Sequence, residues 1–410
     1  MDTSQQTAVV IGASHAGAQL VASLRTEGWE GRIIMISDEA FLPYHHPPLS
    51  KDFLSGEKEE DKLWIRSESF YEKQQIEFTP NQWVKSIDRA AKNLHLVQGE
   101  TIAYDKLALC TGAAIRKLNV PGAELENVLY LRDLADAKRL KTAIAGKQRA
   151  VIIGGGYIGL EAAASLSKFG IRSTVLEAGE RVLQRVACQE VSDYITAEHQ
   201  RQGVSIHCNT LVSSIHGEDK VESVHCQGGE SYPADLVVIG IGVNPNIELA
   251  EASGLTCSDG IHVDEFARTD DHDIVAAGDC TFHPNQLYEL QLRLESVPNA
   301  VDQARTAAAS LCGKEKAYNS LPWFWSDQFG LKLQTAGINA GYDQVLVRDE
   351  GESGFVAWYL NQGKLLAADC INQPRVFAAA KMILTQQYPV TQDELIDSNF
   401  DLREVVKRNR

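Results

Sequence analysis

The sequence predicts an α/β protein with two Rossmann-like dinucleotide-binding domains and a small α+β domain at its C-terminal end. Two glycine-rich loops, Gly12–Gly17 and Gly154–Gly159, each follow an apolar strand and open a segment with helical periodicity. From about residue 319 the pattern changes to alternating, aromatic-rich segments such as Gly354–Leu360. Because one such loop holds one dinucleotide, two loops predict two nucleotide sites in the chain.

The first domain begins with a strand near residues 8–12, a helix near 16–27 and a strand at 33–36. The second of these strands ends on Ser37-Asp38-Glu39. A strand over 107–109 runs into a turn that contains Thr111 and Gly112 and completes this half.

The second domain repeats this plan with a strand at 150–153, a helix near 157–169 and a strand at 173–176. Glu177 follows the last of these, and a strand at 236–239 leads into Gly240-Ile241-Gly242. A further strand and turn over 273–279 would return the chain to the first domain. That domain is therefore expected to be discontinuous.

These changes of pattern set the predicted domain boundaries. The first domain takes residues 1–113 and 243–318, the second takes 114–242, and the C-terminal domain takes 319–410. Within the C-terminal domain we expect a helix near 374–387 and a frayed, mostly polar end from Arg403.

Length and charge narrow the class of protein. A chain of 410 residues exceeds what one core usually supports. The net charge of −16 argues against nucleic acid or an anionic membrane as the main partner, because the long-range field repels both. The polar start has no secretory signal pattern, and no apolar stretch is long enough to span a membrane, so we expect a soluble cytoplasmic protein.

The eight cysteines are scattered, without a C-x-x-C pair that would bind a metal or form a redox disulfide. We expect free thiols packed as small hydrophobic residues. The adjacent histidines His45 and His46 point apart and have no third ligand spaced nearby, so no metal site is predicted. His15 is interpreted as an exposed residue in the first turn of its helix.

The second loop has the complete fingerprint. Gly154, Gly156 and Gly159 allow a tight turn, close approach of the backbone to a pyrophosphate, and close packing of helix on strand. The pyrophosphate would rest on the helix N-terminus at Tyr157 and Ile158, where N–H groups and the helix dipole favour an anion. Glu177 is placed to accept hydrogen bonds from a ribose and disfavours a 2′-phosphate, which favours NADH, although the nearby Arg181 weakens that preference.

The first loop is less complete, because Ser14 stands where the second glycine is expected. Asp38 and Glu39 are equal candidates for the ribose partner. Asp279, at a later strand end, could accept from ribityl hydroxyls, and the helix that begins near Val297 could face a flavin ring. Two different dinucleotides that face each other are typical of a flavin and a nicotinamide.

The chain resembles the bacterial NADH-dependent ferredoxin reductases, which include reductase components of ring-hydroxylating dioxygenases and of cytochrome monooxygenase systems. The resemblance covers nearly the whole chain and rests on Pro47–Lys51, Gly154–Glu161, Gly240-Ile241-Gly242, Ala277–Cys280, Glu295–Ala300 and Trp323–Gln328. It implies a glutathione-reductase-type architecture with an FAD domain, an NAD domain and a C-terminal domain.

The resemblance also implies which residues bind the cofactors. FAD would be held by Gly12, Ser14, Ala16, Gly17, Asp38, Lys51, Val84, Thr111, Gly112, Arg132, Asp279 and Val297, with Arg116 a weaker candidate. NADH would be held by Gly154, Gly156, Tyr157, Ile158, Gly159, Glu177 and Gly242.

Three catalytic roles follow from the same resemblance. Lys51 would lie near the reactive face of the flavin, where an ammonium stabilises the anionic reduced ring. Glu161 would lie close to the nicotinamide and pair with Lys51. Trp325, in a loop of the C-terminal domain, would line the flavin edge where the acceptor docks.

The implied reaction is electron transfer from NADH through FAD to a small acidic 2Fe-2S ferredoxin that feeds an oxygenase. Residues 42–47, where disulfide reductases of this fold carry their redox cysteines, contain no cysteine. Two alternatives remain open: a rubredoxin reductase, and a non-catalytic NADH-responsive flavoprotein of the apoptosis-inducing-factor type. An acidic acceptor would need a local basic surface, for which Arg293, Arg305 and Lys314 are candidates.

Overall fold

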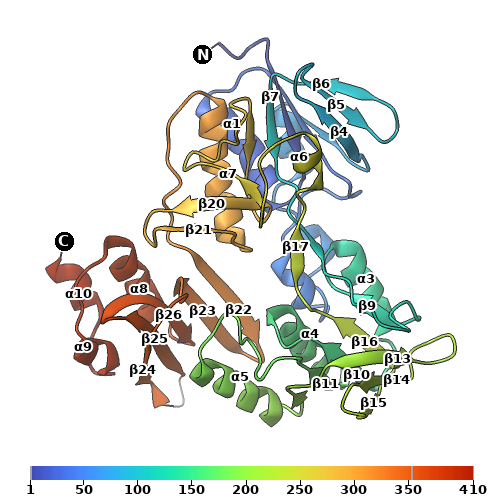
Figure 1. Cartoon of the computed structure of the whole chain (residues 1–410), viewed down its shortest axis with the longest axis vertical. Coiled ribbons are helices and arrows are strands. Elements are labelled where there is room, and N and C mark those ends of the chain that lie inside the picture. Colours follow the sequence, from blue (N-terminus) through green and yellow to red (C-terminus); the bar gives the residue numbers. More distant parts are fainter. Residues whose placement is uncertain (1, 352–353, 410) are drawn as a thin grey trace. The chain divides into compact units, whose positions relative to one another are not determined.

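The computed structural model describes residues 2–351 and 354–409. These residues form two compact units (Figure 1). Unit 1 consists of residues 2–45, 63–114 and 244–322, and unit 2 of residues 46–62, 115–243 and 323–409. Two of the crossings between the units lie in a two-stranded sheet formed by β8 (Ala113–Ile115) and β17 (Val243–Pro245).

A five-stranded parallel sheet forms the centre of unit 1. Its strands, in spatial order, are β19 (Ile274–Ala276), β7 (Lys106–Leu109), β1 (Thr7–Ile11), β2 (Arg32–Ile36) and β3 (Ile76–Thr79). Successive side chains of a strand point to opposite faces, so Val10 packs under the helices α1 (His15–Glu27) and α7 (Val297–Leu311), whereas Val9 packs on the other face. Both faces are covered, which explains why these strands are continuous apolar runs.

The other face carries smaller elements. They are the antiparallel sheet β4 (Val84–Asp88), β5 (Asn93–Leu96) and β6 (Thr101–Ala103), the helix α6 (Glu248–Ala252) and the strand β18 (Ile261–His262), which pairs with β20 (Thr281–Asn285) and through it with β21 (Leu290–Leu292). The short helix α2 (Glu68–Lys73) lies on the same face as α1 and α7, because Tyr71 shares their core. Val84 and Leu94 of the small sheet and Ala250 of α6 share one core with Val9.

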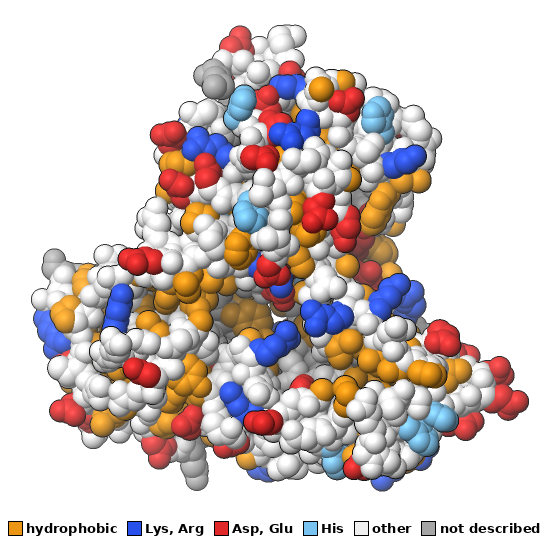
Figure 2. Space-filling model, in the orientation of Figure 1, with side chains coloured by type: hydrophobic (Ala, Val, Ile, Leu, Met, Phe, Trp, Pro, Cys, Tyr) orange, Lys and Arg blue, Asp and Glu red, His pale blue; other side chains and the backbone are white. Residues whose placement is uncertain are grey.

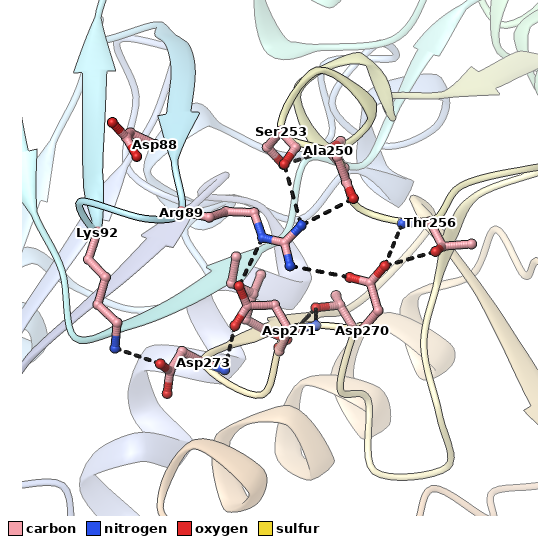
Figure 3. A network of polar contacts seen from close by, with 12 residues as sticks. Asp88, Arg89, Lys92, Ala250, Ser253, Thr256, Asp270, Asp271 and Asp273 are labelled. Carbon is pink, nitrogen blue, oxygen red and sulfur yellow. Dashed lines mark hydrogen bonds and ion pairs between the residues drawn. The ribbon is translucent and has the colours of Figure 1, made fainter.

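An ionic cluster ties the small sheet to the later part of unit 1 (Figure 3). Arg89 Nε donates to Asp271 Oδ2 at 2.9 Å, and its Nη1 donates to the backbone oxygen of Gly254 at 3.1 Å. Asp273 accepts from Lys92 Nζ at 2.5 Å and from Lys106 Nζ at 2.6 Å. These contacts join segments separated by more than 150 positions in the sequence, so they stabilise the tertiary fold of unit 1.

The first sheet contains a strand from far along the sequence. β19 joins the first sheet by parallel pairing with β7, with Ile274 opposite Leu107 and Ala276 opposite Leu109. The segment 46–62, by contrast, belongs by its contacts to unit 2 although it lies within the predicted first domain. It contains the short 3₁₀ helices η1 (Pro47–Ser50) and η2 (Glu60–Lys62).

Unit 2 contains a second five-stranded parallel sheet, in the order β12 (Ser205–His207), β11 (Arg172–Leu176), β10 (Arg149–Ile153), β16 (Leu236–Ile239) and β9 (Val128–Tyr130). Its helices are α3 (Leu134–Ala143), α4 (Tyr157–Ser167) and α5 (Gln189–Arg201). A small antiparallel sheet adds β13 (Val212–His216), β14 (Ser223–Cys226) and β15 (Ser231–Pro233).

The C-terminal part of unit 2 is an antiparallel sheet with helices beside it (Figure 1). Its elements are β22 (Trp323–Gln328), β23 (Leu331–Gly337), β24 (Gln344–Asp349), β25 (Phe355–Asn361), β26 (Lys364–Ile371), α8 (Pro374–Gln386), α9 (Gln392–Ile396) and α10 (Arg403–Arg408). Leu333 and Ala357 of this sheet share a core with Leu160 of α4 and Val191 of α5. The sheet therefore packs directly on the helices that follow the second glycine loop.

Two sequence predictions about this region are wrong. The chain from Arg403 does not fray: it forms α10, because Val405 and Val406 are buried and the helix packs on α8. Trp325 does not lie in a loop, since it belongs to β22 and pairs with Gln334 of β23. Aromatic residues favour strands, which is the signal that the loop interpretation overlooked.

Acidic and basic side chains are interspersed over most of the face shown in Figure 2, and several Lys and Arg side chains gather near its centre. In the described part of the chain, no helix is long and apolar enough to cross a membrane. The eight cysteines are free thiols, and five of them are buried, as the sequence predicted.

Candidate active site

The first glycine loop is shaped by the two glycines at its ends. Gly12 has a φ of +103°, and a β-carbon on it would lie 2.1 Å from the backbone oxygen of Cys110. A β-carbon on Gly17 would lie 1.9 Å from the backbone oxygen of Gly12. Ser14 is the N-cap of α1 but its side chain does not cap the helix. The tight turn therefore requires both glycines and leaves the helix N-terminus without a side-chain cap.

Gly278 brings together residues that are far apart in the sequence. A β-carbon on Gly278 would lie 3.2 Å from the β-carbon of Ala16 in α1 and 3.7 Å from that of Ala300 in α7. Asp279 follows Gly278 directly, and Val297 is the first residue of α7. The predicted FAD residues Ala16, Asp279 and Val297 thus converge at the carboxyl end of the first sheet.

The structure separates the two acidic candidates for the first ribose. Glu39 Oε2 accepts a hydrogen bond from the Tyr44 hydroxyl at 2.6 Å, whereas Asp38 is exposed just beyond β2. A carboxylate that is held by a tyrosine is less able to turn toward a ligand. The geometry therefore favours Asp38.

The turn after β7 is fixed by a residue that the sequence analysis did not single out. Thr111 Oγ1 donates to the backbone oxygen of Asn246 at 2.7 Å, and Asn246 Nδ2 donates to the backbone oxygen of Thr111 at 2.8 Å. Gly112 follows with a φ of +66°. The reciprocal bonds hold the turn at the end of the strand, and no signal in the sequence pointed to Asn246.

The second loop has outer glycines in the same arrangement as the first loop but has a glycine at its central position. A β-carbon on Gly154, whose φ is +110°, would lie 2.4 Å from the backbone oxygen of Gly240, and one on Gly159 would lie 2.1 Å from that of Gly154. A β-carbon on Gly156 would meet no protein atom within 4 Å. The chain's own packing requires the outer two glycines, so the open space at Gly156 is room for a ligand.

Glu177 lies at the end of β11 and is held by backbone amides. Its Oε2 accepts from Gly155 N at 2.6 Å and its Oε1 accepts from Gly179 N at 2.7 Å. A carboxylate has about four acceptor positions, so acceptor capacity remains for ribose hydroxyls. Arg181 donates to the backbone oxygen of Cys188 at 3.2 Å and to Ser192 Oγ at 2.5 Å. The Arg181 guanidinium is therefore engaged in hydrogen bonds within the protein. It is not positioned to bind a 2′-phosphate, so it no longer weakens the preference for NADH.

A buried ion pair lies beside the second loop. Lys51, just after η1, places Nζ 2.8 Å from Glu161 Oε1 on α4, as the resemblance implied. Glu161 Oε2 accepts from Ser50 Oγ at 2.5 Å, and Oε1 accepts from Ser326 Oγ of β22 at 2.5 Å. Glu161 is 3% exposed, so an ammonium and two hydroxyls hold a carboxylate that water hardly reaches.

Ser50 and Ser326 are residues of the candidate site that sequence reasoning missed. Both lie inside motifs that were already recognised, Pro47–Lys51 and Trp323–Gln328, directly beside a predicted site residue. Ser50 is held in turn, because its backbone oxygen accepts from Ser165 Oγ of α4 at 2.6 Å. A buried small hydroxyl gives no periodic signal, so only the three-dimensional structure identifies its partner.

Aromatic side chains adjoin this ion pair in sequence. The ring of Tyr157 lies 4.6 Å from that of Phe324, and the ring of Trp325 lies 5.5 Å from that of Trp323. Burial raises the pKa of the Tyr157 hydroxyl far above its ordinary value, so this tyrosine remains neutral. Tyr157 and Trp325 therefore present apolar surface on the α4 and β22 side of unit 2.

The predicted site residues divide between the units. Unit 1 contains Gly12, Ser14, Ala16, Gly17, Asp38, Val84, Thr111, Gly112, Asp279 and Val297. Unit 2 contains Lys51, Arg116, Arg132, Gly154, Gly156, Tyr157, Ile158, Gly159, Glu161, Glu177, Gly242 and Trp325.

The expected exposure of His15 is wrong. The side chain is buried in the first turn of α1, with its ring 5.5 Å from that of His45. A polar residue at a helix start is usually exposed, but this helix start lies over the end of the sheet and is covered by the loop that follows β2.

The three basic candidates for acceptor docking already have acidic neighbours. Arg305 Nη1 lies 2.5 Å from Asp302 Oδ1, and Lys314 Nζ lies 3.0 Å from Glu27 Oε2. Arg293 pairs with Asp259 and with Glu295. Arg305 and Lys314 remain half-exposed, so their charges are accessible but partly neutralised.

The fold and the two loops define a protein that binds two dinucleotides. Helices α1 and α4 start at an N-cap without a side-chain cap bond and have no acidic residue in the first turn, whereas Asp133 caps α3 and Ser296 caps α7. This arrangement leaves the N-termini of α1 and α4 open to an anionic pyrophosphate. The residues present thus suit FAD in unit 1 and a nicotinamide dinucleotide in unit 2.

Comparisons with known proteins identify the family. Residues 6–304 match the family model described as pyridine nucleotide-disulphide oxidoreductase, and residues 323–406 match the model described as reductase C-terminal. The chain belongs to the pyridine nucleotide-disulphide oxidoreductases and is an oxidoreductase that uses FAD and NAD(H).

Similar proteins span nearly the whole length. Rhodocoxin reductase of Rhodococcus erythropolis is 41% identical over 98% of this chain and 95% of its own length. A rubredoxin-NAD(+) reductase of Pseudomonas putida is 38% identical over 90% of this chain and 96% of its own length. The crystal structure of a covalent putidaredoxin reductase–putidaredoxin complex matches with a TM-score of 0.96 and 38% identity, covering 99% of both chains.

Proposed function

We propose that this enzyme transfers electrons from NADH through FAD to a small 2Fe-2S ferredoxin that feeds an oxygenase. In the proposal FAD is bound by residues 1–113 and 243–318, NADH by residues 114–242, and residues 319–410 complete the acceptor side. Similar proteins are named as reductases of rhodocoxin, putidaredoxin and rubredoxin, which supports an electron-carrier protein as the acceptor.

The observation that carries the proposal is a chain with two dinucleotide loops and no thiol pair to relay electrons. The eight cysteines are free, and burial raises the pKa of the Cys110 and Cys280 thiols above their ordinary value. A thiol with a raised pKa is a poor nucleophile, because the thiolate is the reactive form. Electrons must therefore leave the flavin directly, which suits a one-electron protein acceptor.

FAD, when bound, would supply the conversion between the two-electron chemistry of NADH and single-electron transfer. The protein's contribution is positioning and charge, because hydride transfer needs no acid or base. Lys51, held by Glu161, would place a fixed positive charge beside the flavin and stabilise its anionic reduced ring. Glu161 and Tyr157 would lie near the nicotinamide, and Trp325 would lie on the acceptor side of the flavin.

The dinucleotide in unit 2 is NADH in this proposal. Glu177 would accept hydrogen bonds from the ribose hydroxyls, and its charge would repel a 2′-phosphate. Because Arg181 is committed to Cys188 and Ser192, it offers that phosphate no counterion. NADH as donor also supports a cytoplasmic location.

The test is anaerobic stopped-flow reduction of the purified yellow protein, followed by transfer to candidate acceptors. NADH should reduce the flavin within milliseconds to seconds, and the reduced enzyme should reduce a 2Fe-2S ferredoxin over many turnovers. Faster turnover with a rubredoxin than with any ferredoxin would favour the alternative acceptor, which the identity to a rubredoxin reductase supports. Flavin reduction slower than minutes would overturn the proposed function.

Acceptor docking can be tested separately on the exposed Arg305. Arg305→Glu should raise the KM for ferredoxin about tenfold, because it reverses one charge facing an acidic partner. Turnover of NADH with ferricyanide should not change. Lys220→Glu, which reverses an equally exposed charge in the β13–β14 region, is the matched control. Equal KM values for the two variants would remove Arg305 from the docking surface.

A further inference from the structure

A buried chain of hydrogen bonds continues from Glu161 away from Lys51. Ser326 Oγ donates to Glu161 Oε1 at 2.5 Å, and Gln328 Nε2 donates to Ser326 Oγ at 3.0 Å. His199 Nε2, on α5, lies 2.8 Å from Gln328 Oε1. All four residues belong to unit 2, and each is at most 3% exposed. Four polar groups from α4, β22 and α5 are thus linked without contact with bulk water.

The direction of every bond in this chain is determined. Ser326 has one hydroxyl proton and donates it to the Glu161 carboxylate, so Gln328 must present its NH₂ group to Ser326. The Gln328 carbonyl oxygen then faces His199, so the imidazole must carry its proton on Nε2. All donors point toward Glu161, which adds partial positive charge around the carboxylate that holds Lys51.

His199, at the end of the hydrogen-bond chain, is a residue that stability alone would not favour at this position. His199 Nδ1 is buried without a hydrogen-bond partner, and the imidazole stacks edge-on against the Phe329 ring at 4.9 Å. Burial lowers the pKa of His199, although the bond to Gln328 and the charge of Glu198 oppose this, so the ring is neutral with a bare Nδ1. An apolar side chain would fill this position at lower cost.

We propose that Ser326, Gln328 and His199 are positioning residues that orient Glu161 and, through it, the Lys51 ammonium. This inference rests on the proposed function, in which Lys51 lies beside the flavin. Lys51 and Ser326 share the same oxygen of Glu161, so the carboxylate can hold the ammonium only in one orientation while Ser326 donates. Without that donor, only the Ser50 hydroxyl on Oε2 and the Lys51 ammonium hold the carboxylate, so Oε1 can shift and the ammonium follows it.

The chain can be cut at its centre with a substitution of similar volume. Gln328→Leu removes the donor to Ser326 and the acceptor for His199. It should slow flavin reduction by NADH about tenfold at saturating NADH with an unchanged KM. It should also shift the oxidised–reduced equilibrium of the flavin about tenfold, or about 30 mV for a two-electron couple. Gln334→Leu, a buried glutamine of the adjacent strand β23, is the matched control and should change neither quantity.

A second pair of variants tests the chain without touching β22. His199→Gln places an amide NH₂ where Nε2–H stands and should keep the wild-type reduction rate and potential. His199→Leu should slow flavin reduction by about half as much as Gln328→Leu on a logarithmic scale, which is about threefold. In the wild-type holoenzyme, ¹⁵N chemical shifts of His199 should report a neutral ring protonated on Nε2. A ring protonated on Nδ1, or equal rates for the two His199 variants, would overturn the inference.

The inference and the proposed function fail in different ways. Lys51→Met and Glu161→Gln test the ion pair itself, and wild-type rate and potential in both would mean that the pair does not lie beside the flavin. If those variants are impaired but Gln328→Leu is not, only the positioning chain is refuted. In a Glu161→Gln background, Gln328→Leu should add no further change, because its effect passes through Glu161. A full additional effect would also refute the chain.

Discussion

The two glycine loops share a backbone frame and differ at the centre and at the acid that follows. In both, the first glycine has a positive φ and faces a backbone oxygen, and the last glycine packs under the first. The central position is Ser14 in unit 1 and Gly156 in unit 2. Asp38 is exposed, whereas Glu177 is held by two backbone amides. The outer glycines are therefore required for folding. The central residue of each loop and the acid that follows it distinguish the two ligand sites.

This difference indicates which cofactor stays and which exchanges. In unit 1 the loop is joined by Gly278, Asp279 and α7, so residues from distant segments enclose one site. In unit 2 the loop has an open centre at Gly156 and a preset acceptor in Glu177. A site closed by many segments suits a resident FAD, and an open site with a fixed selectivity element suits an exchangeable NADH.

The largest expected effect comes from the last glycine of each loop. Gly17→Ala places a β-carbon 1.9 Å from Gly12 O and should destabilise unit 1 by more than about 4 kcal/mol, so the protein should be purified without flavin. Gly159→Ala causes the same clash, at 2.1 Å, in unit 2. It should retain FAD that dithionite reduces but NADH does not. Flavin content and anaerobic titration measure both, and loss of flavin from both variants would break the distinction between the sites.

The two units should also respond to pH in opposite directions. Burial raises the pKa of Asp369 in β26 to about 6 from 3.8, although hydrogen bonds from Thr335 and Tyr359 oppose the rise. The unfolded state then loses its proton first, so unit 2 loses stability as pH rises from about 4 to about 6, on the order of 3 kcal/mol. Asp369→Asn should remove that loss. Denaturant unfolding at pH 4 and 6.5 measures it, and a pH-independent difference from wild type would contradict it.

In unit 1, stability should fall as the pH is lowered, which is the opposite of the change expected for unit 2. Burial alone would raise the pKa of Asp273. The ammonium groups of Lys106 and Lys92 lower it by more than burial raises it, so the pKa lies below its ordinary value. The carboxylate of Asp273 therefore stabilises unit 1 at pH values above its ordinary pKa. This stabilisation is lost as the pH falls through the lower pKa of the folded state. Lys106→Met should therefore destabilise unit 1 at pH 7 and converge with wild type near pH 2. A constant difference across this range would show that the cluster in Figure 3 contributes no pH dependence.

The selectivity of the second site should depend on Glu177 alone. Glu177→Gln keeps an acceptor for one backbone amide but removes the charge, and it should raise the ratio of NADPH to NADH kcat/KM by about 10- to 100-fold. Asp38→Asn is the matched change at the first site and should leave that ratio unchanged. Steady-state rates with ferricyanide measure both. An unchanged ratio in Glu177→Gln would place the ribose partner elsewhere.

The smallest expected effect is at the loop centres. Gly156→Ser should fold normally, because no protein atom lies within 4 Å of the new β-carbon, but it should raise the KM for NADH about tenfold by narrowing the ligand space. Ser14→Gly should leave flavin content unchanged. An unaltered KM in Gly156→Ser would mean that the dinucleotide does not approach the backbone at this point.

The parts that could be predicted from the sequence are those with a repeating physical signal. The apolar strands, the two loops and the return of strand 274–276 to the first sheet all have such a signal, and the structure confirms them. Lys51 and Glu161 were linked only by family resemblance, because a lone lysine and a helix glutamate look ordinary in a sequence.

The sequence could not predict contacts that depend on tertiary packing. Ser326 and Gln328 reach Glu161 only because β22 packs on α4, and the burial of His15 depends on the loop after β2. Glu39 and Asp38 had equal standing until the bond from Tyr44 separated them. Arg403 marked the start of a polar tail, and only the burial of Val405 and Val406 shows that the tail is a helix.

The late position of β19 in the first sheet has a consequence for synthesis. Unit 1 lacks a strand, the Gly278 junction and all of α7 until the ribosome has passed residue 311, although its first strand begins at Thr7. The strands of the second parallel sheet, in the segment 115–243, are all synthesised earlier, and the C-terminal sheet that packs on α4 and α5 follows α7. Domains generally fold as units during synthesis, so the nucleotide half in the middle of the chain should fold before the half that begins it. Released chains truncated after residue 260 should bind NADH and retain no flavin.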